Sequence, residues 1–220
     1  MKRYRLLPAV ILLLGCCTAI LHAQQAGMEG LLSPESGPAA ANFVRFSTAE
    51  GLPGNNTTCL TTDTEGFLWV GTMNGLARFD GRRFSAFRTL SPGTSLPDEP
   101  VEAIFADGAQ MLWVKFAKGL YQMSLTTFHA VRCEQNLLPH CADDTGNIYF
   151  SYPEGVAMFR KKQGDFQWFP LVVQGKKVSV SLICKGKKGL LLVTSAEGMF
   201  RFDTRNHTYE RLNALHEAAG

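Results

Sequence analysis

Few residues of this chain are of types that could do chemistry, and they form no recognisable catalytic motif. Asp143 and Asp144 are adjacent carboxylates of the kind used for acid–base catalysis or metal binding. Both fall in a predicted turn, where aspartates commonly bond the backbone and face solvent. The chain has no Gly-x-Ser-x-Gly, His-Glu-x-x-His or phosphate-binding loop. The sequence therefore predicts no catalytic residue, no cofactor-binding residue and no metal site.

An enzyme built on the same scaffold is the alternative reading, as a polysaccharide lyase or hydrolase. Such an enzyme would need acids and histidines to gather on one face, and the candidates are Asp143, Asp144, His140 and His207. The histidines share no common spacing. We therefore expect these four side chains not to converge, and we expect a protein that is not an enzyme.

The cysteines and lysines also lack a functional pattern. Cys59, Cys133, Cys141 and Cys184 contain no CxxC pair and fit no zinc spacing. Cys141 and Cys184 fall at equivalent positions and are predicted to be buried strand residues, with a disulfide left open. The lysines at 176–177 and 185–188 are predicted to be solvated turn charges, because no aromatic stacking pattern accompanies them.

Charge and composition limit the class of protein. The formal net charge is +3, but Lys2, Arg3 and Arg5 lie in the first five residues. From Gln24 onward, 19 basic residues face 19 acidic ones, so no basic footprint for nucleic acid is present. Hydrophobic residues make up 45% of the chain and charged residues 19%, which predicts a packed core.

A repeat of about 40 residues organises the chain. One marker position holds Trp69, Trp113, Tyr149 and Leu192, spaced 44, 36 and 43 residues apart. A turn glycine follows each one with the same spacing, at Gly75, Gly119, Gly155 and Gly198. This period is typical of propeller blades. We predict these eight residues to be structural, the large side chains filling the space between blades and the glycines adopting backbone angles that are costly for other residues.

Each repeat divides into four short predicted strands. In the first copy these are 57–61, 67–72, 76–79 and 83–88, separated by turns rich in Asp, Asn and Gly. We therefore predict an all-β fold of about four four-stranded antiparallel blades, within 42–212, at about 57–88, 100–132, 136–170 and 178–212. The third and fourth copies lack the tryptophan, so we expect them to pack less tightly than the first.

The N-terminus is typical of an export signal. A basic start is followed by a mostly apolar run from Leu6, and Leu21-His22-Ala23 suits cleavage before Gln24. We predict a signal peptide at 1–23, a leader at 24–41 and a tail at 213–220. An uncleaved anchor is one alternative, and lipidation at Cys16 is another, because Leu13-Leu14-Gly15-Cys16 resembles a lipobox.

The residues of the first copy carry a family resemblance. The segment from Glu50 to Asn56 and the run Asp63-Thr-Glu-Gly-Phe-Leu-Trp-Val-Gly-Thr-Met-Asn-Gly-Leu-Ala-Arg-Phe-Asp-Gly81 resemble the two-component regulator propeller repeat. In that family the blades form the exported sensor of hybrid histidine kinase systems, and members typically sense oligosaccharides. The resemblance extends over roughly 43–212 and weakens where Tyr149 and Leu192 replace tryptophan.

The resemblance implies a periplasmic signal-transduction sensor module that binds an oligosaccharide or another periplasmic ligand. No kinase histidine box or receiver is present, so we expect a fragment of a longer hybrid sensor. Residues 42–47 suit a further strand that has no blade to complete. We therefore predict an open, incomplete ring whose partner is a second copy or the remainder of the sensor kinase.

Overall fold

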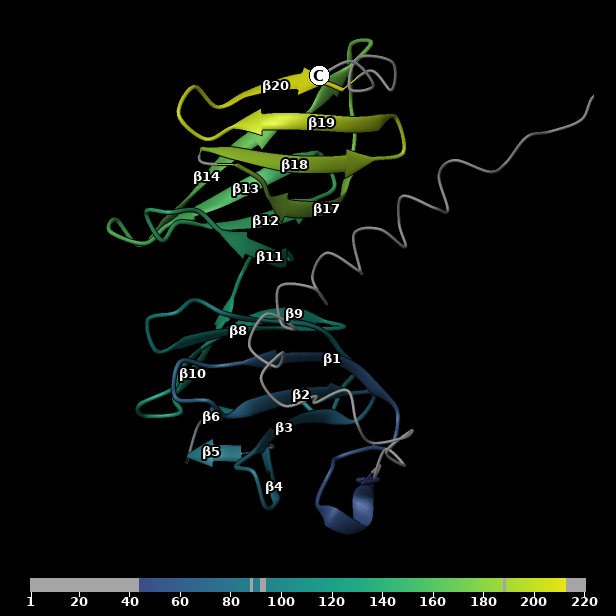
Figure 1. Cartoon of the computed structure of the whole chain (residues 1–220), viewed down its shortest axis with the longest axis vertical. Helices are drawn as coiled ribbons and strands as arrows, with labels where there is room; N and C mark the ends of the chain where they lie inside the picture. Colours follow the sequence, from purple (N-terminus) through teal and green to yellow (C-terminus); the bar gives the residue numbers. More distant parts are fainter. Residues whose placement is uncertain (1–43, 88, 92–93, 188, 213–220) are drawn as a thin grey trace, which may run out of the picture. The chain divides into compact units, whose positions relative to one another are not determined.

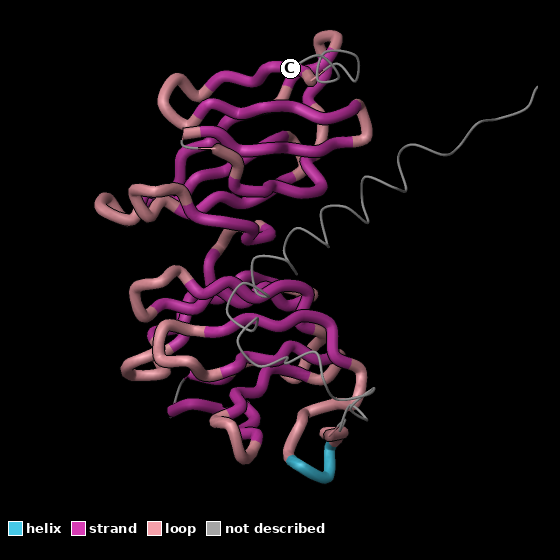
Figure 2. Tube along the Cα trace, viewed as in Figure 1, coloured by secondary structure: helices cyan, strands magenta, loops and turns pink. Residues whose placement is uncertain are grey.

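Short strands joined by tight turns account for nearly all of the described chain, as Figure 2 shows. The structure is a computed structural model that describes residues 44–87, 89–91, 94–187 and 189–212. The predicted signal peptide, the lipidation candidate Cys16, the leader and the tail at 213–220 lie outside these residues. The chain from Arg45 onward forms one compact unit, and the following description concerns that unit.

Four antiparallel sheets of four strands each follow one another along the chain (Figure 1). Within each sheet the strands pair in chain order. The prediction of an all-β fold made of four-stranded propeller blades is therefore confirmed. The blades consist of β1 (Thr57–Thr62), β2 (Leu68–Thr72), β3 (Gly75–Phe79) and β4 (Phe84–Phe87); β7 (Val101–Ala106), β8 (Met111–Phe116), β9 (Gly119–Ser124) and β10 (Ala130–Cys133); β11 (Leu138–Ala142), β12 (Ile148–Tyr152), β13 (Gly155–Arg160) and β14 (Asp165–Pro170); and β17 (Val180–Lys185), β18 (Leu190–Ser195), β19 (Gly198–Asp203) and β20 (Thr208–Arg211).

Apolar side chains fill the space between consecutive blades. Trp69 of the first blade lies in one buried cluster with Val101 and Leu112 of the second. Trp113 of the second blade packs in the same way on Ile148 of the third, and Tyr149 of the third packs on the fourth. Alternation along each second strand explains this pattern, because successive side chains point to opposite faces of a sheet.

The tyrosine that replaces tryptophan in the third blade is completely buried. Tyr149 is fully buried, at 0% exposure, like Trp69. The cluster around it joins β13 and β14 to β17, β18 and β19 through residues such as Phe169, Val193 and Phe202. Leu192, at the equivalent position of the fourth blade, is only half-buried. The aromatic markers of the first and third blades are therefore buried to the same degree, and weaker packing of the third and fourth blades stays a prediction.

The four blades do not close into a ring, as predicted. Strand-to-strand packing joins each blade to the next through the strands β1, β7, β11 and β17. In the described part of the chain, no packing of comparable extent joins the first blade to the fourth.

The segment before the first blade differs from the prediction of a strand at 42–47. Residues 44–47 are irregular and lead into a 3-10 turn, η1 (Thr48–Glu50), which Ser47 caps. Phe46 packs on Phe79 and Phe84 of the first blade, with ring centroids 5.1 and 5.4 Å away. Leu52 is buried with Val70 and Ala77 on the same blade. This segment therefore covers one face of the blade without adding a strand, because its capping box holds it in a turn.

Two small hairpins between blades were missed in the sequence. They are formed by β5 (Thr89–Ser91) with β6 (Thr94–Ser95), and by β15 (Val172–Val173) with β16 (Lys176–Lys177). In the second hairpin, Gln174 and Gly175 both have positive φ, at 50° and 77°. Two positive angles in succession define the tight turn that suits a two-residue hairpin loop.

The turn glycines are only partly as predicted. Gly75, Gly155 and Gly198 have φ of 121°, 150° and 128°, which disfavour side chains. Gly119 is not among the positive-φ residues, so the prediction was wrong there. A Cβ atom at Gly119 would instead lie 3.0 Å from Arg132 Nε, whose guanidinium donates to the carbonyl of Lys118.

Candidate functional site

A polar pocket of about 320 Å³ lies at the seam between the third and fourth blades. Its walls come from the turn after β11, the turn between β17 and β18, and the turn after β19. In a four-stranded antiparallel sheet paired in chain order, the turns after the first and the third strand lie at the same end of the sheet. The turns after β11, β17 and β19 therefore lie at the equivalent end of their two blades. The lining residues are Asp143, Asp144, Thr145, Asn147, Gly189, Thr204 and Arg205.

Asp143 organises the wall that the third blade contributes. Its Oδ1 accepts hydrogen bonds from the backbone N–H groups of Thr145 and Asn147, at 2.8 and 3.0 Å. Its Oδ2 accepts from the Tyr149 hydroxyl at 3.1 Å. Burial raises the pKa of Asp143, but hydrogen bonds from Thr145 and Asn147 outweigh burial and hold the pKa below its ordinary value. Asp143 is thus an ionised structural anchor, and its side chain is more enclosed than the predicted solvated turn former.

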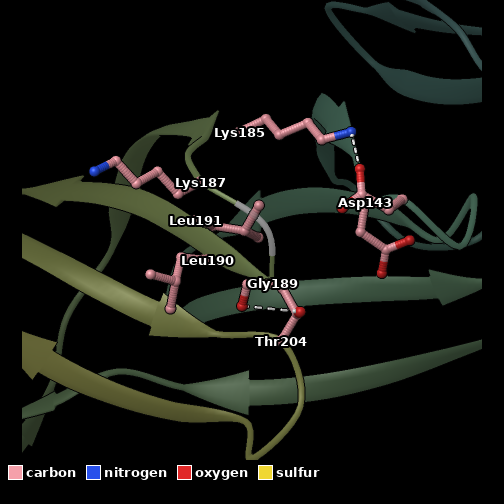
Figure 3. Close-up of a pocket in the computed structure, with 8 residues that line it drawn as sticks. Asp143, Lys185, Lys187, Gly189, Leu190, Leu191 and Thr204 are labelled. Carbon is pink, nitrogen blue, oxygen red and sulfur yellow. Dashed lines mark hydrogen bonds and ion pairs between the residues drawn. The ribbon is translucent and has the colours of Figure 1, made fainter.

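The fourth blade supplies hydroxyl and guanidinium groups to the pocket, and Lys185 lies beside it in a smaller neighbouring cavity. Lys185 Nζ lies 2.7 Å from Asp144 Oδ1 and bridges the two blades. The Thr204 hydroxyl donates to the Gly189 carbonyl at 3.1 Å. Figure 3 shows Lys185 reaching toward the turn that holds Asp143, whereas Lys187 extends away from that turn. Lys185 and Lys177 are exposed, as predicted, but each also belongs to a surface ion pair, with Asp144 and Glu154 respectively.

Arg205 is the cation of the pocket that has no acidic partner in an ion pair among the described residues. Its Nε would lie 3.3 Å from a Cβ atom added at Gly189, so the guanidinium covers that glycine. The pocket therefore combines carboxylate, amide, hydroxyl and guanidinium groups. Together these groups both donate and accept hydrogen bonds, which suits a ligand with several hydroxyl groups.

The predicted candidates for catalysis do not gather in this pocket. His140 is hydrogen-bonded to Ser151 Oγ at 2.9 Å, and burial lowers its pKa to about 4. His207 stacks on Phe169, with ring centroids 4.5 Å apart. Asp143 and Asp144 are neighbours, but neither histidine lines the pocket with them. A general acid would need a raised carboxyl pKa, whereas the pKa of Asp143 is lowered.

The candidates for metal binding and redox chemistry form no cluster among the described residues. Among the residues that the structure describes, no group of three or more His, Cys, Asp or Glu side chains could hold a metal ion. Cys59, Cys133, Cys141 and Cys184 are all half-buried. Burial raises the pKa of Cys141 to about 12, and the Cys184 thiol nearby adds to this effect. Burial also raises the pKa values of Cys59 and Cys133, and a protonated thiol is a poor nucleophile, so a structural role is favoured for these three cysteines.

A link between an aspartate and an aromatic residue was missed in the sequence. In the first blade the Trp69 indole donates to Asp63 Oδ2 at 2.8 Å, as Tyr149 does to Asp143. The signal was an aspartate six residues before each aromatic marker. In the fourth repeat, Gly186 stands at this position before Leu192, which has no donor.

Comparison with known proteins agrees with the predicted repeat family. Residues 51–74 match the family model of the two component regulator propeller. No curated protein matches the chain by sequence. Among the described residues, no helix is long and apolar enough to span a membrane.

Solved structures share the fold. The extracellular domain described for the hybrid two component system BT3049 of B. thetaiotaomicron superposes with a TM-score of 0.64 at 18% identity, over 78% of this chain and 26% of that one. The corresponding domain of BT4673 from the same organism gives 0.59 at 15% identity, over 72% and 21%. This chain therefore spans about a quarter of the length of those sensor domains.

An enzyme shares the fold as well. A virginiamycin B lyase from Staphylococcus aureus, solved with quinupristin, gives a TM-score of 0.58 at 13% identity, over 76% of this chain and 58% of that one. Identity this low establishes a common blade architecture only.

Proposed function

We propose that this chain is the ligand-recognition propeller of an exported two-component sensor, and that it forms part of a longer sensor chain. The observation that carries the proposal is the regulator-propeller match at 51–74, on a fold shared with two extracellular sensor domains. The basic and apolar N-terminus supports export to the periplasm. The greater length of those sensor domains supports a longer sensor.

The proposed ligand is an oligosaccharide that is held in the pocket between the third and fourth blades. Vicinal hydroxyl groups of a sugar accept from the Arg205 guanidinium and donate to Asp144 or Asn147. Asp143 holds the turn in place while it remains bonded to Tyr149. A ligand bridging Asp144 and Arg205 would therefore touch both blades and stabilise the seam between them.

An enzymatic function is not favoured by the described residues. The Asp143 oxygens already accept hydrogen bonds, and Asp144 is paired with Lys185. Neither carboxylate is placed as a general acid, so the likeness to a lyase extends to the fold alone.

Binding tests the proposal directly. The exported chain is applied to a glycan array, and each hit is titrated by calorimetry. We expect saturable binding that Arg205→Gln weakens about tenfold, because a charge-assisted hydrogen bond is lost. Failure of every glycan to bind would contradict the proposal.

A matched control exists in the first blade. Arg82 occupies the same place in its turn as Arg205, since Asp80 and Asp203 each accept from the N–H groups two and three residues later. Arg82 does not line the pocket. Arg82→Gln should therefore leave the affinity unchanged, whereas an equal loss in both variants would show a non-specific charge effect.

A further inference from the structure

Trp168 lies at a position where the other blades carry a small or charged residue. Trp168 lies on β14, the last strand of the third blade, and pairs with Ala157 of β13. The equivalent partners in the other blades are Ala86, Arg132 and Arg211, all exposed. Trp168 is 42% exposed, whereas Trp69 and Trp113 are 0% and 1% exposed. Its indole is therefore not needed to fill the space between blades.

The Trp168 ring is held in place by other aromatic rings. Tyr152 meets it edge to face, with centroids 5.0 Å apart and planes at 80°. Phe166 lies 6.1 Å away on the same strand. Such contacts restrict the rotamer of the indole. A surface ring with a fixed orientation loses little entropy when a ligand stacks on it.

Charged groups lie directly beside this aromatic pair. Lys177 of β16 lies 2.6 Å from Glu154, and both side chains are about half exposed. Glu154 lies in the two-residue turn between Tyr152 and Gly155, which pair with each other at the end of the β12–β13 hairpin. Burial raises the pKa of Tyr152, and the Glu154 carboxylate raises it further. We call this group of residues, Trp168, Tyr152, Glu154 and Lys177, which the ring contact, the turn and the ion pair link in sequence, the Trp168 surface.

The backbone beneath the Trp168 surface is closely packed. A Cβ atom at Gly155 would lie 2.3 Å from the carbonyl oxygen of Phe169 and 2.6 Å from the Leu171 nitrogen. The Leu171 N–H also donates to the Glu154 carbonyl at 2.9 Å. The backbone of the turn that carries Glu154 is thus packed against the end of β14, the strand that carries Trp168.

We infer that the Trp168 surface binds the ring of a sugar, with the indole stacked on the C–H face and Glu154 and Lys177 bonded to its hydroxyl groups. Exposed aromatic rings also occur in protein interfaces, but the centres of those interfaces are depleted in Lys and Glu. An aromatic ring beside an ion pair matches a ligand that is apolar on one face and polar at its edge. Nucleic acid is disfavoured because the paired charges cancel.

This inference rests on the proposed function and extends it to a second contact on the third blade. Tyr152 and Asp143 lie at opposite ends of β12, since Asp143 precedes its first residue and Tyr152 is its last. The Trp168 surface is therefore separate from the seam pocket.

Fluorescence and calorimetry test the inference with cellobiose, xylobiose and chitobiose as probes. Since Trp168 is the exposed tryptophan of the described chain, acrylamide should quench it preferentially. A bound sugar should reduce that quenching in a saturable way. In calorimetry, Trp168→Ala should weaken binding about tenfold or more, while Trp168→Phe should retain part of the affinity.

Controls separate this inference from the proposed function. Phe46 is another exposed aromatic, at 40% exposure on the first blade, and Phe46→Ala should not change the affinity. If Trp168→Ala binds normally while Arg205→Gln does not, the Trp168 surface is overturned and the proposed function stands. If no saccharide binds even the unaltered chain, the proposed function fails as well. Circular dichroism of each variant confirms folding, which is expected because alanine and arginine occupy the equivalent strand positions.

Discussion

A carboxylate six residues before an aromatic ring links the turns of this protein to its core. Asp63 and Asp143 each accept from two backbone N–H groups of their own turn and from one buried aromatic side chain. The second blade departs from this pattern, because Asp107 faces Lys161 at 3.2 Å and the Trp113 indole N–H has no partner. Each carboxylate therefore stabilises local and long-range structure together.

Removing one of these carboxylates should be costly. We expect Asp143→Ala to lower the free energy of unfolding by about 2–3 kcal/mol, because several donors lose their acceptor in a half-buried site. Urea unfolding measures this change. Asp165→Ala, which removes a surface partner of Arg160, serves as the control and should cost below about 1 kcal/mol. Equal losses in the two variants would contradict the anchoring role.

Burial of His140 should make stability depend on pH. Its pKa is about 4 in the folded chain and about 6.5 when solvated, so between these values the unfolded state binds more protons. Stability is therefore full above pH 6.5 and falls as pH drops toward 4, by about 2–3 kcal/mol. Unfolding measured at pH 7 and pH 4 should show a smaller difference in His140→Gln. An unchanged difference would refute this role.

At the scale of the element, each blade is stabilised mainly by the seam with the next blade. Trp69, Trp113 and Tyr149 are each covered by the following blade, whereas Leu192 is half-buried on the last one. Burial of the marker residue therefore depends on the following blade that covers it, as well as on the size of its own side chain.

Two substitutions at equivalent positions test this dependence. Trp69→Ala should destabilise the chain by about 3–5 kcal/mol, because it empties a closed seam. Leu192→Ala should cost less, about 1–2 kcal/mol, since that side chain is smaller and is only partly buried. Thermal or urea unfolding distinguishes the two cases. A large loss at Leu192 would mean that its face is covered in solution.

The strands could be predicted from the sequence because markers and turn glycines recur with equal spacing. Leu68 begins β2 one residue after the predicted start, and the other strands of this blade differ by a similar margin. The hairpin at Val172–Val173 and Lys176–Lys177 was missed because two-residue strands carry no periodicity. The seam pocket was missed because its residues come from three turns of two blades. The aspartate–aromatic link required side-chain geometry.

At the scale of the whole molecule, we propose that the N-terminus directs export. Export predicts that the mature chain begins near Gln24, or that it carries lipid on Cys16. Mass spectrometry of the exported protein measures this. An intact N-terminus at Met1 in exported protein would contradict both outcomes.

The central claim is that the third and fourth blades recognise a saccharide. Amide-resolved NMR titration with a saccharide that binds in calorimetry tests it most directly. We expect saturable shifts at 143–147 and 204–205 around the seam pocket, and at 152–154, 166–168 and 177 around the Trp168 surface. The first blade, at 57–87, should remain unchanged. Shifts confined to the first and second blades, or none at saturating saccharide, would contradict the claim.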